Sequence, residues 1–399
     1  MMVVVGLGAD GWDGLPDVQR RLVVEAATVL GGRRHLGLLP EVPGQRREPW
    51  PSPLRAGLPA LLDDLGPGPV VALASGDPLV SGVGTTLVEL LGADAVRIEP
   101  AVSSVALARA RMGWAAESCA VVTVVGRDPA AVLRELAPGR RVLVLSSDAS
   151  TPATLADLLV DRGYGASTMT VLGDLGAATE SRTAATAASW AGPAPALNVV
   201  ALELLGPPVG GWVAGLPDNA FEHDGQLTKR DLRASALARL APTPGEHLWD
   251  VGAGAGSVGI EWMRAHRTCT TTAIEADPAR ADRIARNAAH LGVPGLRVVT
   301  GRAPDALADL PAPDAVFVGG GASRPGVLDA CLRALRPGGR LVVHGVTLET
   351  EQALAAAYAE HGGELTRIAV ETATPVGGFT GWTPARAVTQ WALRTRDAS

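Results

Sequence analysis

The sequence predicts an α/β protein built from two domains. Its 399 residues exceed the length of one ordinary domain, and 47% of them are hydrophobic, enough for two sizeable cores. In both halves, short apolar runs alternate with glycine-containing loops and helical stretches, a pattern typical of α/β layers. A stretch rich in glycine and proline separates the halves. We therefore predict one domain over residues 1–207, a linker over 208–220 and a second domain over 221–399.

Charge and cysteine content exclude several classes of protein. The formal net charge of −6 argues against a general nucleic-acid binder, because such a protein needs a basic surface. Cys119, Cys269 and Cys331 match no metal-ligand spacing, so we expect a reducing compartment without a disulfide framework, and no metal. No basic segment precedes the apolar start "MMVVVGLGAD", and no apolar run approaches the ~20 residues that span a bilayer. We expect a cytoplasmic protein without membrane or nucleic-acid partners.

The first half carries six apolar runs that predict strands, each followed by a loop or a helical stretch. These runs are Val3–Val5, Val70–Ala74, Val96–Ile98, Ala120–Val125, Val142–Leu145 and Asn198–Leu204. Their alternation with helical segments favours α/β layers over an all-β domain.

The second half predicts a doubly wound, mostly parallel sheet. A helix over Asp231–Pro242 precedes a strand at His247–Val251, a glycine loop and a helix at Ser257–Ala265. After the strand "TTTAIEAD", Asp277 and Pro278 are typical of an N-cap and a first helical residue, and Gly292 of a helix stop. Further strands are predicted in "LRVVTG", "DAVFVGG" and "RLVVHGV". In such sheets, ligands bind beyond the carboxyl ends of the strands.

The loop "DVGAGAGSVGIE", Asp250–Glu261, predicts a nucleotide site whose ligand must be identified. The pattern G-x-G-x-x-G of dinucleotide sites falls on Gly254, Gly256 and Gly259, one turn late, with its last glycine already inside the helix. No Lys-Ser or Lys-Thr follows the glycines, which excludes a P-loop. The better match is D-x-G-x-G-x-G, from Asp250 to Gly256.

Two carboxylates favour S-adenosylmethionine as the ligand of this loop. Asp250 would repel a pyrophosphate, whereas the ammonium and sulfonium of S-adenosylmethionine are positive. Glu275 ends the next strand, where a carboxylate can accept hydrogen bonds from both ribose hydroxyls. "LRPGGRLVV" adds a turn that feeds a late strand, as is typical of class I methyltransferases.

The second half resembles the decarboxylating precorrin methyltransferase domain of cobalamin synthesis. The resemblance covers most of residues 218–355 and is carried by "GQLTKRDLRASALARLAPTPGEHLWDVGAGAGSVGIEW", "AIEAD", "GRAPDAL", "PDAVFVGGG" and "GGRLVVHGVTLET". It implies a Rossmann-like class I methyltransferase fold. The cofactor positions that match are Thr228, Gly252, Ala253, Gly254, Ala255, Gly256, Glu275 and Ala303.

The first half resembles a tetrapyrrole methylase of the same pathway, a fold of two α/β subdomains with the cofactor between them. "VGLGADGWDGLP", "LGGRRHL", "LASGDPLVSGVG" and "IEPAVSSVALARARMGW" follow in the expected order. The resemblance implies a second S-adenosylmethionine site. The matching positions are Gly6, Gly8, Gly76, Asp77, Pro78, Ser103 and Ser104.

Joined in one chain, the two halves resemble a family that methylates carbons 5 and 15 of a precorrin and removes carbon dioxide from the ring-C acetate. The substrate's carboxylates require counter-charge, which arginine supplies through its planar fork. Candidate substrate-binding residues are Arg33, Arg34 and His35 in the first half, and Arg230 and Arg233 in the second. Gly319, Gly320 and Gly321 would leave room for the flat macrocycle. We also expect a homo-oligomer.

Lys229 and His344 are the candidate catalytic residues. Lys229 is the only lysine in a chain that otherwise uses arginine, which suggests that a compact ammonium is needed; an ordinary surface lysine is an equal alternative. His344 is a candidate for proton transfer, and a packed histidine is an alternative. The nucleophile is a substrate carbon, so the protein's task is alignment. The alternative function is a methyltransferase for another polycarboxylate. A nicotinamide oxidoreductase would need a dinucleotide loop in register, and a non-catalytic binding module would not need two separate nucleotide-type loops.

Overall fold

The computed structural model describes residues 1–208 and 211–396, and its contacts divide the chain into two units. The first unit holds Met1–Pro129 and Glu135–Pro207; the second holds Ala130–Arg134 and the chain from Pro208 onward. Residues 209–210 of the predicted linker and 397–399 of the predicted second domain lie outside the described residues. The later part of that linker packs on the second unit, because Leu216 is buried in its core.

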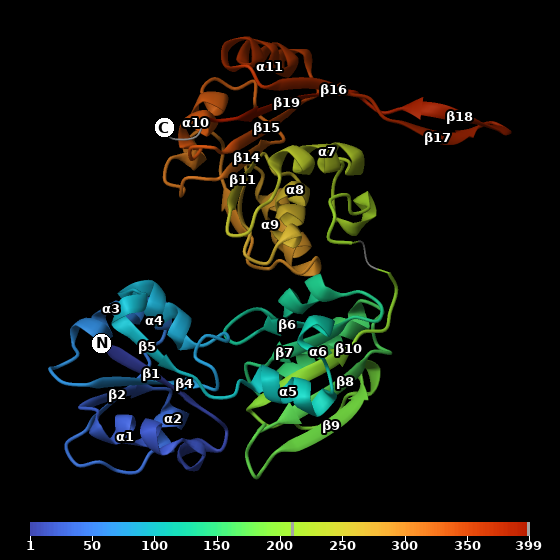
Figure 1. Ribbon diagram of the computed structural model, residues 1–399. Helices are drawn as coiled ribbons and strands as arrows, with labels where there is room; N and C mark the ends of the chain where they lie inside the picture. Colours follow the sequence, from blue (N-terminus) through green and yellow to red (C-terminus); the bar gives the residue numbers. More distant parts are fainter. Residues whose placement is uncertain (209–210, 397–399) are drawn as a thin grey trace. The chain divides into compact units, whose positions relative to one another are not determined.

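A parallel five-stranded sheet begins the first unit, in the order β3-β2-β4-β1-β5 (Figure 1). Its elements are β1 (Met2–Leu7), α1 (Asp17–Glu25), β2 (Thr28–Gly31), α2 (Arg33–Gly37), β3 (Arg46–Pro49), α3 (Leu54–Asp63), β4 (Val70–Ser75), α4 (Val83–Leu91) and β5 (Val96–Glu99). On β1, Val5 and Leu7 pack with α1, whereas Val4 packs with α3 and α4. Both faces of this sheet are therefore covered, as the apolar runs predict.

A second, mixed sheet completes the first unit, in the order β6-β7-β10-β8-β9. Its elements are α5 (Ser104–Met112), β6 (Cys119–Thr123), β7 (Arg141–Leu145), α6 (Thr151–Asp161), β8 (Thr168–Gly173), β9 (Ser181–Thr186) and β10 (Asn198–Glu203). All six predicted strands of this half are confirmed, with β6 displaced toward the N-terminus from the predicted Ala120–Val125. Four strands of this half, β2, β3, β8 and β9, were not predicted from the sequence.

The second unit is a seven-stranded sheet in the order β13-β12-β11-β14-β15-β19-β16. Its elements are α7 (Arg230–Leu240), β11 (His247–Val251), α8 (Ser257–Ala265), β12 (Thr270–Glu275), α9 (Pro278–His290), β13 (Arg297–Thr300), β14 (Ala315–Val318), α10 (Val327–Ala334), β15 (Arg340–Gly345), α11 (Leu348–His361), β16 (Glu364–Ile368) and β19 (Val388–Arg394). The predicted mostly parallel sheet is confirmed, and β19 runs antiparallel to both β15 and β16.

Alternate residues of the central strands enter two different cores. Leu248 and Phe317 pack with α7, α8 and α9. Trp249 and Val316 pack with α10 and α11 on the other face. This period of two is what a doubly wound sheet requires, because successive side chains of a strand point to opposite faces. Among the described residues, every helix is too short or too polar to cross a bilayer.

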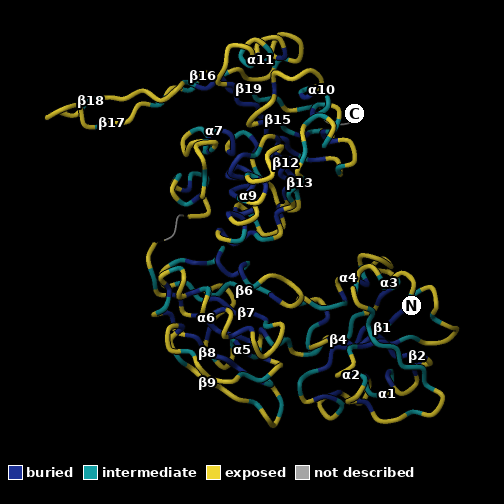
Figure 2. The backbone as a smooth tube through the Cα atoms, turned by 180° about the vertical axis from the view of Figure 1, so that it is seen from behind, coloured by how far each residue is buried: buried dark blue, intermediate teal, exposed yellow. Residues whose placement is uncertain are grey.

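A hairpin of β17 (Glu371–Val376) and β18 (Phe379–Pro384) forms a separate two-stranded sheet and projects from the second unit (Figure 1). Figure 2 shows it exposed along nearly its whole length. Three large apolar side chains on it face solvent: Val376 is 59% exposed, Phe379 85% and Trp382 71%.

Candidate active site

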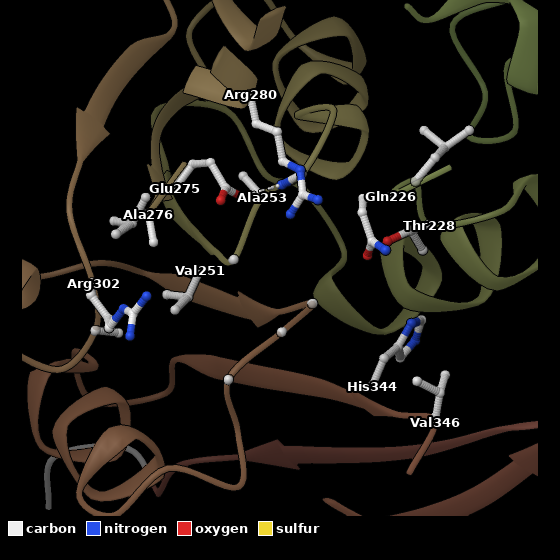
Figure 3. A pocket seen from close by; sticks show the side chains of 18 of the residues that line it. Gln226, Thr228, Val251, Ala253, Glu275, Ala276, Arg280, Arg302, His344 and Val346 are labelled. Atoms are coloured by element: carbon white, nitrogen blue, oxygen red, sulfur yellow. Dashed lines mark hydrogen bonds between the residues drawn. The ribbon is translucent and has the colours of Figure 1, made fainter. Parts of the chain in front are cut away.

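A pocket of about 360 Å³ lies where β11, β12, β14 and β15 of the second unit end (Figure 3). This is the edge at which a doubly wound sheet binds ligands. Segments that follow these strands line the pocket, together with the segment that precedes α7. Of the predicted residues, the lining includes Thr228, Lys229, Gly252, Ala253, Gly254, Glu275, Ala303, Gly319, Gly320, Gly321 and His344.

The glycine loop is shaped by two close backbone approaches. Gly252 and Gly254 both adopt positive φ, at 67° and 60°. A Cβ on Gly252 would lie 2.8 Å from the Gly320 oxygen, and one on Gly254 would lie 2.7 Å from the Gln226 oxygen. Only glycine fits at these positions, so bare backbone lines the pocket here. The neighbouring Ala255 and Gly256, also predicted to bind cofactor, do not line it; Ala255 is fully buried and Gly256 caps α8.

Glu275 ends β12 inside the pocket, where it is 6% exposed. One carboxylate oxygen accepts the Gly254 N–H at 2.8 Å, and the other accepts the Asp277 N–H at 3.1 Å. A carboxylate oxygen has room for further donors, such as sugar hydroxyls. Val251, Ile274, Ala276 and Ala303 add apolar walls. The accepting carboxylate of Glu275 and these apolar walls fit the ribose and adenine of S-adenosylmethionine.

Asp250 plays a different part from the one that its charge suggested. Its side chain is 1% exposed, lies outside the pocket lining and accepts the Gly259 N–H of α8 at 2.9 Å. Burial raises the pKa of Asp250 to about 7. An inward carboxyl that is partly protonated at neutral pH cannot select a cationic ligand by charge, so that step of the sequence analysis was wrong. The residue holds α8 against β11.

The segment that precedes α7 is pinned across the glycine loop, and we call Glu222–Lys229 the strap. Asn287 of α9 accepts the Glu222 N–H at 2.9 Å and donates to the oxygens of Glu222 and Ala255. Asp224 pairs with Arg280 and Arg283 of the same helix. The hydrogen bond from Arg280 is the largest cause that holds the pKa of Asp224 well below its usual range.

Arg233, predicted to bind substrate, is fully buried and belongs to the interior. Its Nε lies 2.5 Å from a Glu261 oxygen, and its other nitrogens donate to the backbone oxygens of Leu216 and Thr228. Glu261 also accepts the N–H groups of Gly215 and Leu216, at 2.6 and 2.9 Å. The substrate role is therefore wrong for Arg233, because protein groups occupy its donors. The residue instead positions Thr228 at the pocket wall.

The other predicted residues of this unit divide between pocket and surface. Lys229 lies on the pocket rim, with its side chain 54% exposed and its Nζ 3.6 Å from Asp218. Arg230, the next residue, is exposed and does not line the pocket. His344 lines the pocket wall and is 8% exposed, and burial lowers the pKa of its imidazole.

Three arginines that the sequence analysis missed line the pocket: Arg280, Arg302 and Arg324. Each follows the carboxyl end of a strand, a placement that the parallel-sheet rule could have identified. Arg280 is bound to Asp224. The guanidinium groups of Arg302 and Arg324 have no partner within residues 1–208 and 211–396. They give the pocket a cationic side suited to carboxylates. In the same ranges, no group of three acidic, histidine or cysteine side chains is arranged to hold a metal.

In the first unit, the predicted cofactor glycines converge at the carboxyl ends of β1, β4 and β5. A Cβ on Gly6 would lie 2.0 Å from the Gly76 oxygen and 2.6 Å from the Ala101 nitrogen. The Gly76 N–H donates to the Leu7 oxygen at 2.9 Å. Ser103 caps α5 by accepting the Ala106 N–H, and Ser104 begins that helix. This edge therefore presents backbone at close quarters, as a nucleotide cradle does.

The remaining predicted residues of this unit have local roles in the fold. Asp77, which precedes Pro78, accepts the Leu79 N–H at 2.9 Å, and Gly8 packs against Asp10. Arg33 and Arg34 are exposed at the start of α2. Burial, and to a smaller extent the positive charge of Arg34, lowers the pKa of His35 to about 4. His35 therefore stays neutral near pH 7 and supplies no counter-charge.

Both halves of the chain match family models. Residues 1–191 match the model of tetrapyrrole (corrin/porphyrin) methylases, and residues 219–395 match that of the precorrin methyltransferase domain. A protein of Sinorhizobium sp., named precorrin-6Y C(5,15)-methyltransferase (decarboxylating), is 48% identical over 98% of this chain and 95% of its own length. A protein of the same name from Mycobacterium tuberculosis (strain CDC 1551 / Oshkosh) is 44% identical over 99% of this chain and 100% of its own.

A solved structure is also similar to part of the chain. The C-terminal domain of precorrin-6Y C5,15-methyltransferase from Rhodobacter capsulatus is 45% identical, with a TM-score of 0.44, over 46% of this chain and 100% of its own length.

We expect Arg233→Met to destabilise the second unit by about 3–5 kcal/mol, because it leaves the Glu261 carboxylate buried without its cation. Urea unfolding, followed through tryptophan fluorescence, to which the fully buried Trp249, Trp262 and Trp391 of this unit contribute, measures this loss. Arg230→Met on the exposed side of the same helix is the control and should change stability little. Equal effects of the two substitutions would show that the buried pair does not stabilise this unit.

Proposed function

We propose a function for this chain from one premise: it belongs to the family of precorrin-6Y C(5,15)-methyltransferases (decarboxylating), with a 48% identical relative that it covers almost completely. It is an S-adenosylmethionine-dependent methyltransferase of cobalamin biosynthesis, with a tetrapyrrole methylase unit followed by a class I methyltransferase unit. It methylates a precorrin at carbons 5 and 15 and decarboxylates it. The observation that carries this function is the identity that extends through both units.

The pocket residues supply the binding and alignment that methyl transfer requires. When bound, S-adenosylmethionine supplies an activated methyl group. Glu275 accepts hydrogen bonds from the cofactor's ribose, beside the bare backbone of Gly252 and Gly254. Arg302 and Arg324, with Lys229, bind carboxylates of the macrocycle. Gly319–Gly321 keep the facing wall free of side chains. Alignment of carbon and methyl is the main task of the protein, because the substrate is its own nucleophile.

We assign the decarboxylation to the second unit, where Lys229 lies on the rim of the cationic pocket. A compact ammonium reaches a carboxylate that the wider guanidinium fork would not fit. Only the carboxylate of the ring-C acetate leaves as carbon dioxide: its C–C bond breaks, the electron pair enters the macrocycle's own imine system, and the remaining methylene takes up a proton from water to become a methyl group. No protein nucleophile is therefore required. A methyltransferase for another polycarboxylate is the second candidate, since the same arginines would serve it.

The product's mass tests this function. Incubated with a precorrin that carries both unmodified carbons and with methyl-labelled cofactor, the protein should add two labelled methyl groups and release one carbon dioxide. Lys229→Arg keeps the net charge and should lower carbon dioxide release, while the methyl that the first unit adds is still transferred. Two methyl additions without carbon dioxide release would contradict the proposed decarboxylation. An unimpaired Lys229→Arg variant would return that residue to an ordinary surface role.

We further propose one cofactor site in each unit, because each sheet of parallel strands presents glycine backbone at its carboxyl edge. Calorimetry of the full chain should then find two equivalents of S-adenosylmethionine. Glu275→Gln removes the charge from hydrogen bonds worth about 1.5–3 kcal/mol each, so one of the two affinities should fall at least tenfold. Asp277→Asn, which changes an exposed N-cap outside the lining, is the matched control. One equivalent in the parent protein would refute the two-site proposal. Equal cofactor affinities in the Glu275 variant and the parent would show that Glu275 has another role.

A homo-oligomer completes the proposal, with the β17–β18 hairpin as the contact between copies. Val376 and Phe379 pair beside the turn. Because successive side chains of a strand point to opposite faces, Trp382, three residues after Phe379, lies on the other face of the ribbon. An isolated two-stranded ribbon is marginal in water, and one with large exposed apolar side chains gains stability by burying them in a second copy.

Light scattering of the full chain tests this contact. Phe379→Ser together with Trp382→Ser should reduce the oligomer to a monomer without loss of the main sheet, because the hairpin lies outside both cores of the second unit. The surface substitution Val213→Ser, at a side chain 85% exposed elsewhere, is the control. A monomeric parent protein, or a double variant that remains oligomeric, would contradict the assignment of the hairpin.

The location and domain boundaries of the chain stay proposals of the same kind. We propose the cytoplasm, because Cys119, Cys269 and Cys331 are free thiols and the latter two are buried. We propose that residues 1–207 and 221–399 act as the two catalytic domains, joined by residues 208–220.

A further inference from the structure

A chain of polar side chains leads from the surface of the second unit to the buried Gln390 and to His344 in the pocket wall. It begins at Glu364 of β16, whose carboxylate accepts two hydrogen bonds from Arg239 of α7, one of them 3.0 Å long. Arg239 also donates to the Ser235 hydroxyl at 2.9 Å. A guanidinium only donates, so whatever faces it must accept.

Gln390 of β19 lies fully buried between Arg239 and His344. Its amide can satisfy both neighbours in one orientation only. The oxygen accepts from Arg239 Nε at 3.0 Å, and the nitrogen then lies 2.9 Å from His344 Nε2 and 3.3 Å from the Ser235 hydroxyl. Because the amide nitrogen donates, His344 Nε2 must accept with its lone pair.

This geometry determines the state of the imidazole. An accepting Nε2 leaves the single ring proton on Nδ1, and a second proton on Nε2 would face an N–H group. Burial and the charge of Arg239 both lower the pKa of His344, which agrees with a neutral ring. Phe317 packs edge-to-face on the imidazole, with the two ring centroids 5.0 Å apart, and restrains its rotation.

The other ring nitrogen is available to a ligand. Nδ1 has no partner within the described ranges 1–208 and 211–396 and is not one of their buried unpaired atoms. His344 lines the pocket together with Thr228 (Figure 3). Lys229 and Gly319–Gly321 line the same pocket. The other charged residues that line this pocket are the cations Lys229, Arg280, Arg302 and Arg324 and the carboxylate of Glu275.

We propose that Glu364, Arg239 and Gln390 hold His344 as a neutral Nδ1–H donor, which orients the macrocycle through an acceptor atom and does not transfer protons. The part concerning the macrocycle rests on the proposed function; the tautomer does not. Gln390 and Arg239 are positioning residues, and His344 touches the substrate. The proton-transfer role predicted from the sequence is thereby replaced by a binding role.

Nuclear magnetic resonance of the full chain, labelled with ¹⁵N-histidine, tests the tautomer without any ligand. The chain has seven histidines, and the signal missing in His344→Phe identifies the residue. We expect the neutral Nδ1-protonated form throughout pH 6–8. Gln390→Glu replaces the donor with an acceptor and should shift the proton to Nε2 and bring titration into this range. Thr389→Val, at the neighbouring residue whose hydroxyl binds Glu351, should leave the spectrum unchanged. An Nε2-protonated or titrating ring in the parent protein would overturn the proposal.

Steady-state kinetics test the role in binding. His344→Phe should raise KM for the tetrapyrrole at least tenfold, with kcat changed less than threefold, as expected when an interaction is equal in ground and transition states. Its affinity for S-adenosylmethionine should stay unchanged, which also shows that the variant folds. A large fall in kcat, together with loss of a pH-dependent limb near the histidine's ordinary pKa, would identify proton transfer and overturn the binding role. Absence of any turnover in the parent protein would instead refute the proposed function and leave the tautomer result standing.

Discussion

The buried ion pair between Arg233 and Glu261 is the constraint on which the pocket depends. Charges without solvent must be paired and fully hydrogen-bonded, and here the bonds reach two segments of backbone, Gly215–Leu216 and Thr228. The pair joins α7 to α8, draws the end of the linker into the core through Leu216, and holds Thr228 at the pocket wall. A substitution on either side would therefore disturb the strap, although neither side chain reaches the ligand.

The strap and the glycine loop determine each other's positions. Gly254 must lack a side chain because the strap crosses it, and the Gly254 N–H is held by Glu275, the same carboxylate that we assign to the cofactor. Ion pairs from α9 secure the strap from the other side. Cofactor contact, loop shape and substrate wall thus belong to one connected arrangement, which reduces the reorganisation that binding requires. The hydrogen-bonded chain from Glu364 through Arg239 and Gln390 fixes His344 in the pocket wall in the same way.

Strong local patterns made much of the fold predictable. The sequence predicted the exact bounds of β11 and α8, where a buried strand, a glycine turn and a buried helix follow directly. It missed β9, whose residues are mostly polar and exposed at a sheet edge. In the site, Glu275 could be placed from its position at a strand end. Arg233 could not, because only the three-dimensional structure shows that Glu261 faces it. The role of Asp250 could not be predicted for the same reason. The alternation of side chains along β11 directs Asp250 inward, under α8, where it accepts the Gly259 N–H.

Membership of the family accounts for the reaction, while the pocket accounts for how this chain could carry it out. The most direct measurement is a crystal structure of the chain with the demethylated cofactor bound. We expect the ribose hydroxyls to lie within hydrogen-bonding distance of the Glu275 carboxylate, beside Gly252 and Gly254, with the strap across them. A cofactor bound elsewhere on the second unit, with this pocket empty, would contradict it.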